Sequence, residues 1–432
     1  MDALAIALSV PVFFLLIALE LMLTRRRQER AFAFHDSVNS LSCGVGQQVI
    51  GLLTAAAKAT GYALVYERFH VTTISPRSPM AWIALLFAVD LAYYAYHWAS
   101  HRVNFLWATH AVHHQSEEYN LSTALRQSWF TSFTSWIFYL PLAVVGFPTT
   151  MFVAMYTLNT LYQFWIHTRT VYRAGFLEAF LNTPSHHRVH HGIDPAYIDK
   201  NYAGIFIVWD RLFGTFQEEA REPVYGTVKP LASWNPFWAN FEPWAQLFAL
   251  MRQTRRLRDK LFFLVAPPEW RPADLGGSVT IPEVSRAAQR KYDSLAPRGL
   301  DAYVAFVFAL LVGGTTALLA FQSKLGPEGQ AFAAATLLFG LLTPGALFEA
   351  RRWAVPIEWL RLGLLVAFAA WLAWGHALQI PVTASAGAAA LVLAIWVGRY
   401  RSRRPEEAIP IDRAMPAPSA TLATLTTPDA LT

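Results

Sequence analysis

Histidines are concentrated in three short motifs of the sequence, HWASH, HAVHH and HRVHH. Residues three or four positions apart lie on one face of an α-helix, so each motif can direct its imidazole rings to the same side. Neutral imidazole is a good ligand for iron, zinc and copper. The motifs therefore predict a metal site. Its candidate ligands are His97, His101, His110, His113, His114, His187, His190 and His191.

The number of histidines points to two metal ions. A tetrahedral zinc ion takes three or four protein ligands, so the eight histidines of the motifs suit two ions better than one. A single HxxxH motif would favour exposed polar histidines that bind nothing. Three motifs that hold eight of the 13 histidines argue against that alternative.

The elements that carry the motifs are predicted to be membrane helices. Hydrophobic residues make up 54% of the 432 residues and charged residues 15%, below the roughly 25% charge of soluble domains. We expect an all-α multispanning membrane protein with about nine transmembrane helices and a cytosolic histidine-rich di-iron cap. The expected spans cover residues 1–23, 41–66, 79–98, 129–148, 150–167, 300–321, 330–349, 357–378 and 382–398.

The basic residues indicate how the chain is oriented. The net charge is +6, but Lys and Arg flank the apolar runs, which is typical of membrane topology signals rather than of a nucleic-acid-binding surface. With the N-terminus outside, the basic stretches at 25–30 and 398–404 lie in the cytosol, together with all three histidine motifs. The single cysteine, Cys43, excludes an intramolecular disulfide framework and a cysteine metal site.

The chain is predicted to have five consecutive parts, because its one long polar block, rich in Pro, Trp and charge, separates two apolar regions. These are N-terminal membrane anchor helices at 1–78, a catalytic domain at 79–220, a cytosolic or membrane-surface segment at 221–299, a C-terminal four-helix membrane region at 300–402, and a disordered tail at 403–432.

Polar residues near the motifs are candidates for supporting roles. Asp90 lies seven residues before His97, and a carboxylate inside a span tends to be functional. We expect it either to orient a ligand histidine or to make a helix-end contact. Glu117 and Glu118 are candidates for the substrate pocket. Candidates for a cofactor site are Asn120, Arg126 and Gln127, with a capped helix start as the alternative. Residues that could serve either loop structure or the site are Asp194, Asp199, Tyr202 and Asp210.

The order HxxxH, HxxHH, HxxHH in a multispanning chain resembles the fatty acid hydroxylase/sterol desaturase superfamily of membrane di-iron oxidases. The segments HHQSEEYNLSTALRQS (113–128), LYQFWIHT (161–168) and NTPSHHRVHHGIDPAYIDKNYAGIFIVWDRLFGTFQEE (182–219) are similar to the alkylglycerol monooxygenase family. The resemblance implies that the eight motif histidines bind two iron ions, and it adds His167 and His186 as further ligands.

The same resemblance implies a membrane enzyme that uses O₂ to hydroxylate a lipid C–H bond, at the ether-linked carbon of alkylglycerols. Its electrons would come from tetrahydrobiopterin or from a separate electron-donor protein. One alternative is a sterol or fatty acyl hydroxylase or desaturase of the same superfamily. The other is a histidine-rich metal transporter, although transport favours polar residues spread over several spans, whereas these histidines gather at one membrane face.

Overall fold

The structure is a computed structural model that describes residues 3–294, 296–297 and 299–401. The predicted disordered tail at 403–432 lies outside the described residues. Within the described residues all regular elements are helices, joined by loops that contain two isolated β-bridges, Leu181 to Phe206 and Gly192 to Tyr225. The all-α architecture expected from the composition is confirmed.

Seven segments of the described chain are long and apolar enough to cross a membrane. These are α1 (Ala3–Arg26), α2 (Phe34–Phe69), α3 (Pro79–Arg102), α13 with η4 (Leu300–Phe321 and Gln322–Lys324), α14 with α15 (Pro327–Gly340 and Leu342–Phe348), α16 (Ala354–Leu372) and α17 (Gln379–Gly398). A multispanning membrane protein is thus supported, although the count of nine spans is not confirmed.

The two expected spans that are absent from the seven candidates are those at 129–148 and 150–167. The first breaks into three pieces: α6 (Thr131–Thr134), η1 (Ser135–Tyr139) and α7 (Leu140–Val145). α7 ends at Gly146, whose φ of +113° favours glycine, and a side chain there would collide with the carbonyl of Thr72. The second expected span is α8 (Thr149–Trp165), which is shorter and less apolar than the seven candidate spans. Together they form a hairpin beside α2 and α3.

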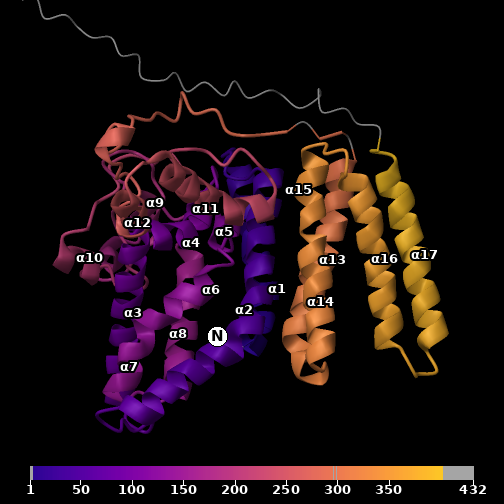
Figure 1. Ribbon diagram of the computed structural model, residues 1–432, viewed down its shortest axis with the longest axis horizontal. Helices are drawn as coiled ribbons and strands as arrows, with labels where there is room; N and C mark the ends of the chain where they lie inside the picture. The colour runs from indigo at the N-terminus through magenta and orange to yellow at the C-terminus, as the bar shows by residue number, and fades with distance from the viewer. Residues whose placement is uncertain (1–2, 295, 298, 402–432) are drawn as a thin grey trace, which may run out of the picture.

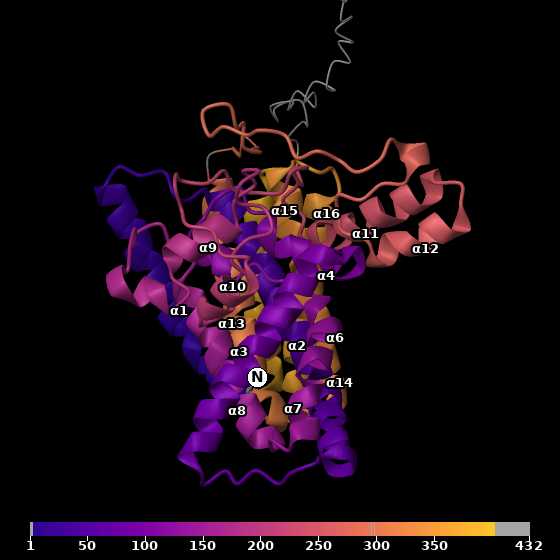
Figure 2. The same cartoon turned by 90° about the vertical axis from the view of Figure 1, so that its left-hand side faces the viewer.

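The remaining helices gather in a cap at one end of the bundle (Figures 1 and 2). They are α4 (Asn104–His114), α5 (Leu121–Ala124), η2 (Gly175–Ala179), α9 (Pro184–His190), α10 (Val208–Phe213), α11 (Pro236–Gln253), α12 (Leu257–Val265) and η3 (Ala273–Leu275). α11 and α12 project sideways from the bundle in Figure 2.

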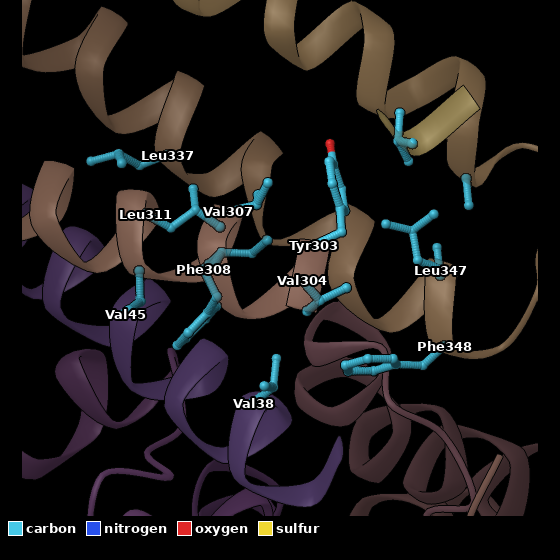
Figure 3. Close-up of a cluster of buried hydrophobic side chains, with 14 of the residues drawn as sticks. Val38, Val45, Tyr303, Val304, Val307, Phe308, Leu311, Leu337, Leu347 and Phe348 are labelled. Atoms are coloured by element: carbon cyan, nitrogen blue, oxygen red, sulfur yellow. The ribbon is translucent and has the colours of Figure 1, made fainter. Parts of the chain in front are cut away.

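The C-terminal helices are attached to the N-terminal part through a buried apolar core. Figure 3 shows Val304 and Phe308 of α13 facing Val38 and Val45 of α2. α13 also packs along α1 and α2, so it joins the C-terminal helices to the N-terminal part of the bundle. A second core joins α2, α3, α7 and α8. The two cores hold the helix ends that carry the histidines in fixed positions.

Candidate metal centre

Three helices deliver the eight motif histidines to one place in the cap. His97 and His101 lie in the last turns of α3, and the chain bends at Val103, whose backbone is extended, before α4 begins. α4 carries the second motif and packs back against α3. The third motif lies on α9, which starts with Pro184 in its first turn, a favoured position for proline.

Nine histidines form two groups in which one ring nitrogen of every member lies within 4.8 Å of the others. All nine side chains are buried. The first group is His97, His101, His110, His114 and His190, and the second is His113, His167, His187 and His191. The structure therefore brings together nine of the ten predicted ligands and leaves out His186.

Each HxxHH motif is divided between the two groups. In α4, His110 and His114 belong to the first group and His113 to the second, whereas in α9 His187 belongs to the second group and His190 to the first. Side chains four residues apart differ by about 40° around a helix, but the third position points about 60° the other way. Each HxxHH motif therefore contributes to both histidine groups, whereas the sequence predicts that its rings share a single helical face.

The ring nitrogens of each group converge in a way that suits a metal ion. In the first group the Nε2 atom of His110 lies 3.0 Å from that of His97 and 3.1 Å from that of His114. In the second, His187 Nε2 lies 3.0 Å from His167 Nε2. The Nε2 atoms of His101 and His190 are buried and have no hydrogen-bond partner. Buried polar atoms without partners are costly, so these converging nitrogens fit the ligands of a cation.

Burial favours the neutral form of the three imidazoles on α4. It lowers the pKa of His110 and His114 well below the usual value, and neighbouring histidines add to the effect. For His113 burial lowers the pKa to about 4. A neutral imidazole has a free lone pair for a metal, whereas a protonated one has none. The residues present therefore fit metal ions of the kind that nitrogen ligands prefer.

Backbone carbonyls in the cap orient several of the rings. His97 Nδ1 donates to the carbonyl of Tyr202 at 2.8 Å, and His190 Nδ1 donates to that of Lys200 at 2.9 Å. A proton held on Nδ1 leaves Nε2 as the nitrogen that faces the metal. The other such contacts are His113 Nδ1 to the carbonyl of Arg126 at 2.9 Å and His167 Nδ1 to that of Gln163 at 2.7 Å.

Asp90 does not make the direct contact with a histidine that the sequence suggested. It lies about 10 Å from His97 along α3, on the side away from the cap, so its short side chain cannot reach the His97 ring. The fully buried carboxylate instead accepts hydrogen bonds from the backbone N–H groups of Ile205 and Phe206 at 2.7 and 2.9 Å. Asn159 Nδ2 donates to it at 2.6 Å and Trp209 Nε1 at 3.0 Å. Asp90 thus holds the loop that presents Tyr202 to the site.

Two of the other candidate acids also support this loop, and one does not. Asp210 accepts hydrogen bonds from the backbone N–H groups of Tyr202 and Ala203, both at 2.8 Å. Asp199 forms an ion pair with Arg102 at 2.5 Å, and its second oxygen lies 3.5 Å from His101 Nδ1. Asp194, by contrast, accepts hydrogen bonds from Arg221 and from the backbone N–H of Val224. Carbonyl acceptors such as that of Tyr202 carry no signal in the sequence.

Neither Glu117 nor Glu118 lines the two cavities that border the histidines. Glu117 accepts a hydrogen bond from the backbone N–H of Tyr292 at 2.6 Å. Glu118 pairs with Lys291 at 2.6 Å. The expected place of these two residues in a substrate pocket is therefore not seen, and both tie a later segment to the cap.

Burial raises the pKa of Glu117 to about 7, with Asp36 and Glu118 adding to the shift and Lys291 opposing it. The folded protein therefore takes up this proton more readily than the unfolded chain, so stability falls as the pH rises from about 5 to 8. We expect Glu117→Gln to reduce that fall, measured as the melting temperature in detergent across this range. An unchanged slope in the variant would contradict the assignment.

The three cofactor-site candidates have different surroundings. Asn120 is the N-cap of α5, where its Oδ1 accepts from the backbone N–H of Ser122 at 2.9 Å. Arg126 is buried and donates to the carbonyl of Val112 at 2.7 Å. In the structure both side chains therefore support the scaffold, and the N-cap role of Asn120 matches the alternative of a capped helix start. Gln127 alone of the three lines a cavity.

The first cavity, of about 200 Å³, runs from the histidines into the membrane-spanning helices. The end of this cavity nearest the cap is formed by His110, His113 and His167. Its walls are mainly apolar residues of α1, α2, α8 and α13. Polar side chains lie near the histidines, among them Gln127 and Gln163. The shape and lining suit a lipid chain that enters from the bilayer.

The second cavity, of about 350 Å³, lies within the cap. Members of both histidine groups reach it, because His101, His114, His190 and His191 all contribute to its wall. The loop before α11, α11 itself and the segment before η3 contribute charged residues to its wall, namely Lys229, Glu242 and Arg271. The histidine groups therefore border two largely apolar cavities, one among the membrane helices and one in the cap whose wall also carries charged residues.

Comparison with known proteins agrees with this arrangement. Residues 82–215 match the fatty acid hydroxylase family. Alkylglycerol monooxygenase from Danio rerio is 37% identical over 361 residues, which cover 83% of this chain and 80% of that protein. The chain belongs to the alkylglycerol monooxygenase family.

The human alkylglycerol monooxygenase is likewise 37% identical over 363 residues, which cover 82% of this chain and 80% of that protein. Ornithine lipid hydroxylase OlsE from Rhizobium tropici is 27% identical over 198 residues, 44% of this chain and 58% of that protein. No solved structure matches. As a member of this family the chain is an oxidoreductase, a membrane lipid monooxygenase with histidine clusters that can bind metal.

Proposed function

We propose that this protein hydroxylates the ether-linked carbon of alkylglycerols, with two iron ions bound by the nine grouped histidines. The observation that carries the proposal is the position of the two histidine groups, at the inner end of an apolar cavity that opens among membrane helices. A C–H bond of a lipid chain can thus reach the metals without leaving the bilayer.

Five histidines would hold one iron and four the other, with carbonyl acceptors orienting the rings. Iron in such a nitrogen-rich site supplies the redox chemistry by which one oxygen atom of O₂ enters a C–H bond. The protein contributes a fixed ligand geometry and a cavity that excludes water from the reaction. His186, outside both groups, is not part of the proposed ligand set.

The end of the first cavity next to the histidines favours a lipid that carries oxygen atoms. Tyr96 lines the cavity one residue before His97, and its hydroxyl is buried without a hydrogen-bond partner. Gln127 and Gln163 line the same region. Their side-chain amides already donate to backbone carbonyls, so the unpaired donor is the Tyr96 hydroxyl. An ether or hydroxyl oxygen would accept a hydrogen bond from it, whereas a plain hydrocarbon chain would leave it unpaired. The relatives named alkylglycerol monooxygenase point to the same substrate class.

We propose the second cavity as the entry for the electron donor, because it reaches both histidine groups from within the cap. Tetrahydrobiopterin is the proposed donor, with a separate carrier protein as the alternative. The overall reaction consumes the lipid, O₂ and the reduced pterin and yields the hydroxylated lipid, water and the oxidised pterin. The hydroxylated ether is a hemiacetal, which breaks into an aldehyde and glycerol.

We also propose that the cap and its histidines face the cytosol. The basic residues Arg25 and Arg26 end α1 at the cap end of the bundle, and Arg399 follows α17 at the same end (Figure 1). Basic residues concentrate on the cytosolic side of membrane proteins. Proteolysis of sealed vesicles of known orientation would test this assignment.

The decisive experiment supplies the purified, iron-loaded protein with an alkylglycerol, tetrahydrobiopterin and O₂. We expect aldehyde to form only when all three are present. If a sterol or a fatty acyl lipid is oxidised and alkylglycerol is not, the superfamily alternative is correct instead. Zinc in the purified protein without lipid oxidation would favour a metal transporter.

A further inference from the structure

Helix α13 lies far outside the segment at 82–215 that matches the fatty acid hydroxylase family, yet it forms part of the first cavity. Four of its residues line the wall: Val312, Thr315, Thr316 and Leu319. Their spacing of three, four and seven positions places them on one face of the helix. The C-terminal membrane region thus contributes directly to the space next to the metal centre.

These residues lie at the end of the cavity away from the histidines. Helix α1 runs along the cavity and shows how far apart its two ends lie. Near the histidines, the carboxylate of Glu20 accepts hydrogen bonds from the backbone N–H of Leu121 at 2.8 Å and from the hydroxyl of Thr168, next to His167. At the other end of α1 Ile6 is buried against Leu319. The stretch of α1 from Ile6 to Glu20 is about 20 Å long. The cavity is therefore bounded by the contact between α1 and α13, well below the metals.

The face that α13 turns to the cavity is apolar, although two of its four residues are threonines. The hydroxyl of Thr315 donates to the carbonyl of Leu311 at 2.9 Å, and that of Thr316 donates to the carbonyl of Val312 at 2.9 Å. Hydroxyls bonded back to their own helix present their methyl groups outward. Together with Val312 and Leu319 they form a surface that suits the end of an alkyl chain.

We propose that this face of α13 sets the length of the lipid chain that the enzyme accepts. The inference rests on the proposed function, in that the chain lies in the first cavity with its reactive carbon at the histidines. A longer chain then meets the α1–α13 contact, and a bulkier residue on α13 stops the chain earlier. Val312 and Leu319 are about 10 Å apart along the helix, so the effect depends on which of the two is changed.

The test compares substitutions at different depths in the reconstituted, iron-loaded enzyme. Val312→Phe should lower the ratio of kcat/KM for a long-chain over a short-chain alkylglycerol by about tenfold or more, since a few methylenes change discrimination by such factors. Leu319→Ala should raise the same ratio, because it opens the far end. The matched control is Leu310→Phe on the exposed face of α13, which should leave the ratio within about twofold.

A second readout is the chain length of lipids that copurify with each variant, measured by mass spectrometry. We expect shorter chains with Val312→Phe and longer ones with Leu319→Ala. Unchanged ratios and unchanged copurified lipids in both variants would overturn the inference while leaving the proposed function intact. If wild-type protein oxidises no alkylglycerol, the proposed function fails, and the copurified lipids still decide the role of α13.

Discussion

Replacing His187 by alanine should abolish activity and metal binding at the second histidine group, whereas replacing its neighbour His186 should preserve both. His187 belongs to the second histidine group, with its Nε2 atom 3.0 Å from that of His167. His186 points elsewhere, and its ring packs against Phe216. Loss of residues that merely orient a ligand costs roughly 10–100-fold in metal affinity or activity, so loss of a ligand should cost more than about 100-fold.

The measurement is metal content per chain by elemental analysis, together with lipid oxidation. His167→Ala serves as a second test, since His167 lies outside the HxxHH motifs but inside the second group. We expect it to behave like His187→Ala. If His186→Ala loses metal while His187→Ala keeps it, the assignment of the two groups is wrong.

Asp90→Ala should cause the largest loss of stability among the variants outside the histidines. The change leaves the N–H groups of Ile205, Phe206 and Trp209 and the amide of Asn159 without their acceptor in a buried region. Each buried donor without a partner costs about 1–3 kcal/mol, so the loss over the four donors should be at least about 4 kcal/mol. The loop that carries the carbonyl acceptor of His97 should loosen as well.

Thermal unfolding in detergent measures this effect, with and without iron. Asp90→Asn is the matched variant, because it keeps one carbonyl acceptor and nearly the same volume. We expect it to recover part of the stability and part of the metal affinity. A melting temperature of Asp90→Ala within about 2 °C of wild type would show that the loop does not depend on this carboxylate.

Much of the fold could be predicted because its signal is local. A run of about twenty apolar residues identifies a spanning helix by length alone, and the spans at the two ends of the chain agree with the helices observed. The stretch at 129–148 is equally apolar but is broken into α6, η1 and α7. The close approach of Gly146 to Thr72 that ends α7 involves a distant part of the chain. Such a contact has no local signature.

The candidate site, like the fold, could be predicted only where its signal is local in the sequence. Eight of the nine grouped histidines follow from motif spacing, because three- and four-residue intervals place rings on one helical surface. The roles of His167 and His186 could not be separated in this way. Nor could those of Asn120 and Arg126, which lie near the histidines in sequence but support the scaffold.

By itself, the sequence determined that the chain is a helical membrane protein with a histidine-rich centre, because composition and periodicity act over single helices. Only the tertiary structure decided which histidine belongs to which group, how carbonyls orient the rings, and that α13 borders the lipid cavity. These properties depend on the angles at which separate helices meet. Such angles result from packing between residues far apart in the chain, for which a single sequence carries no direct signal.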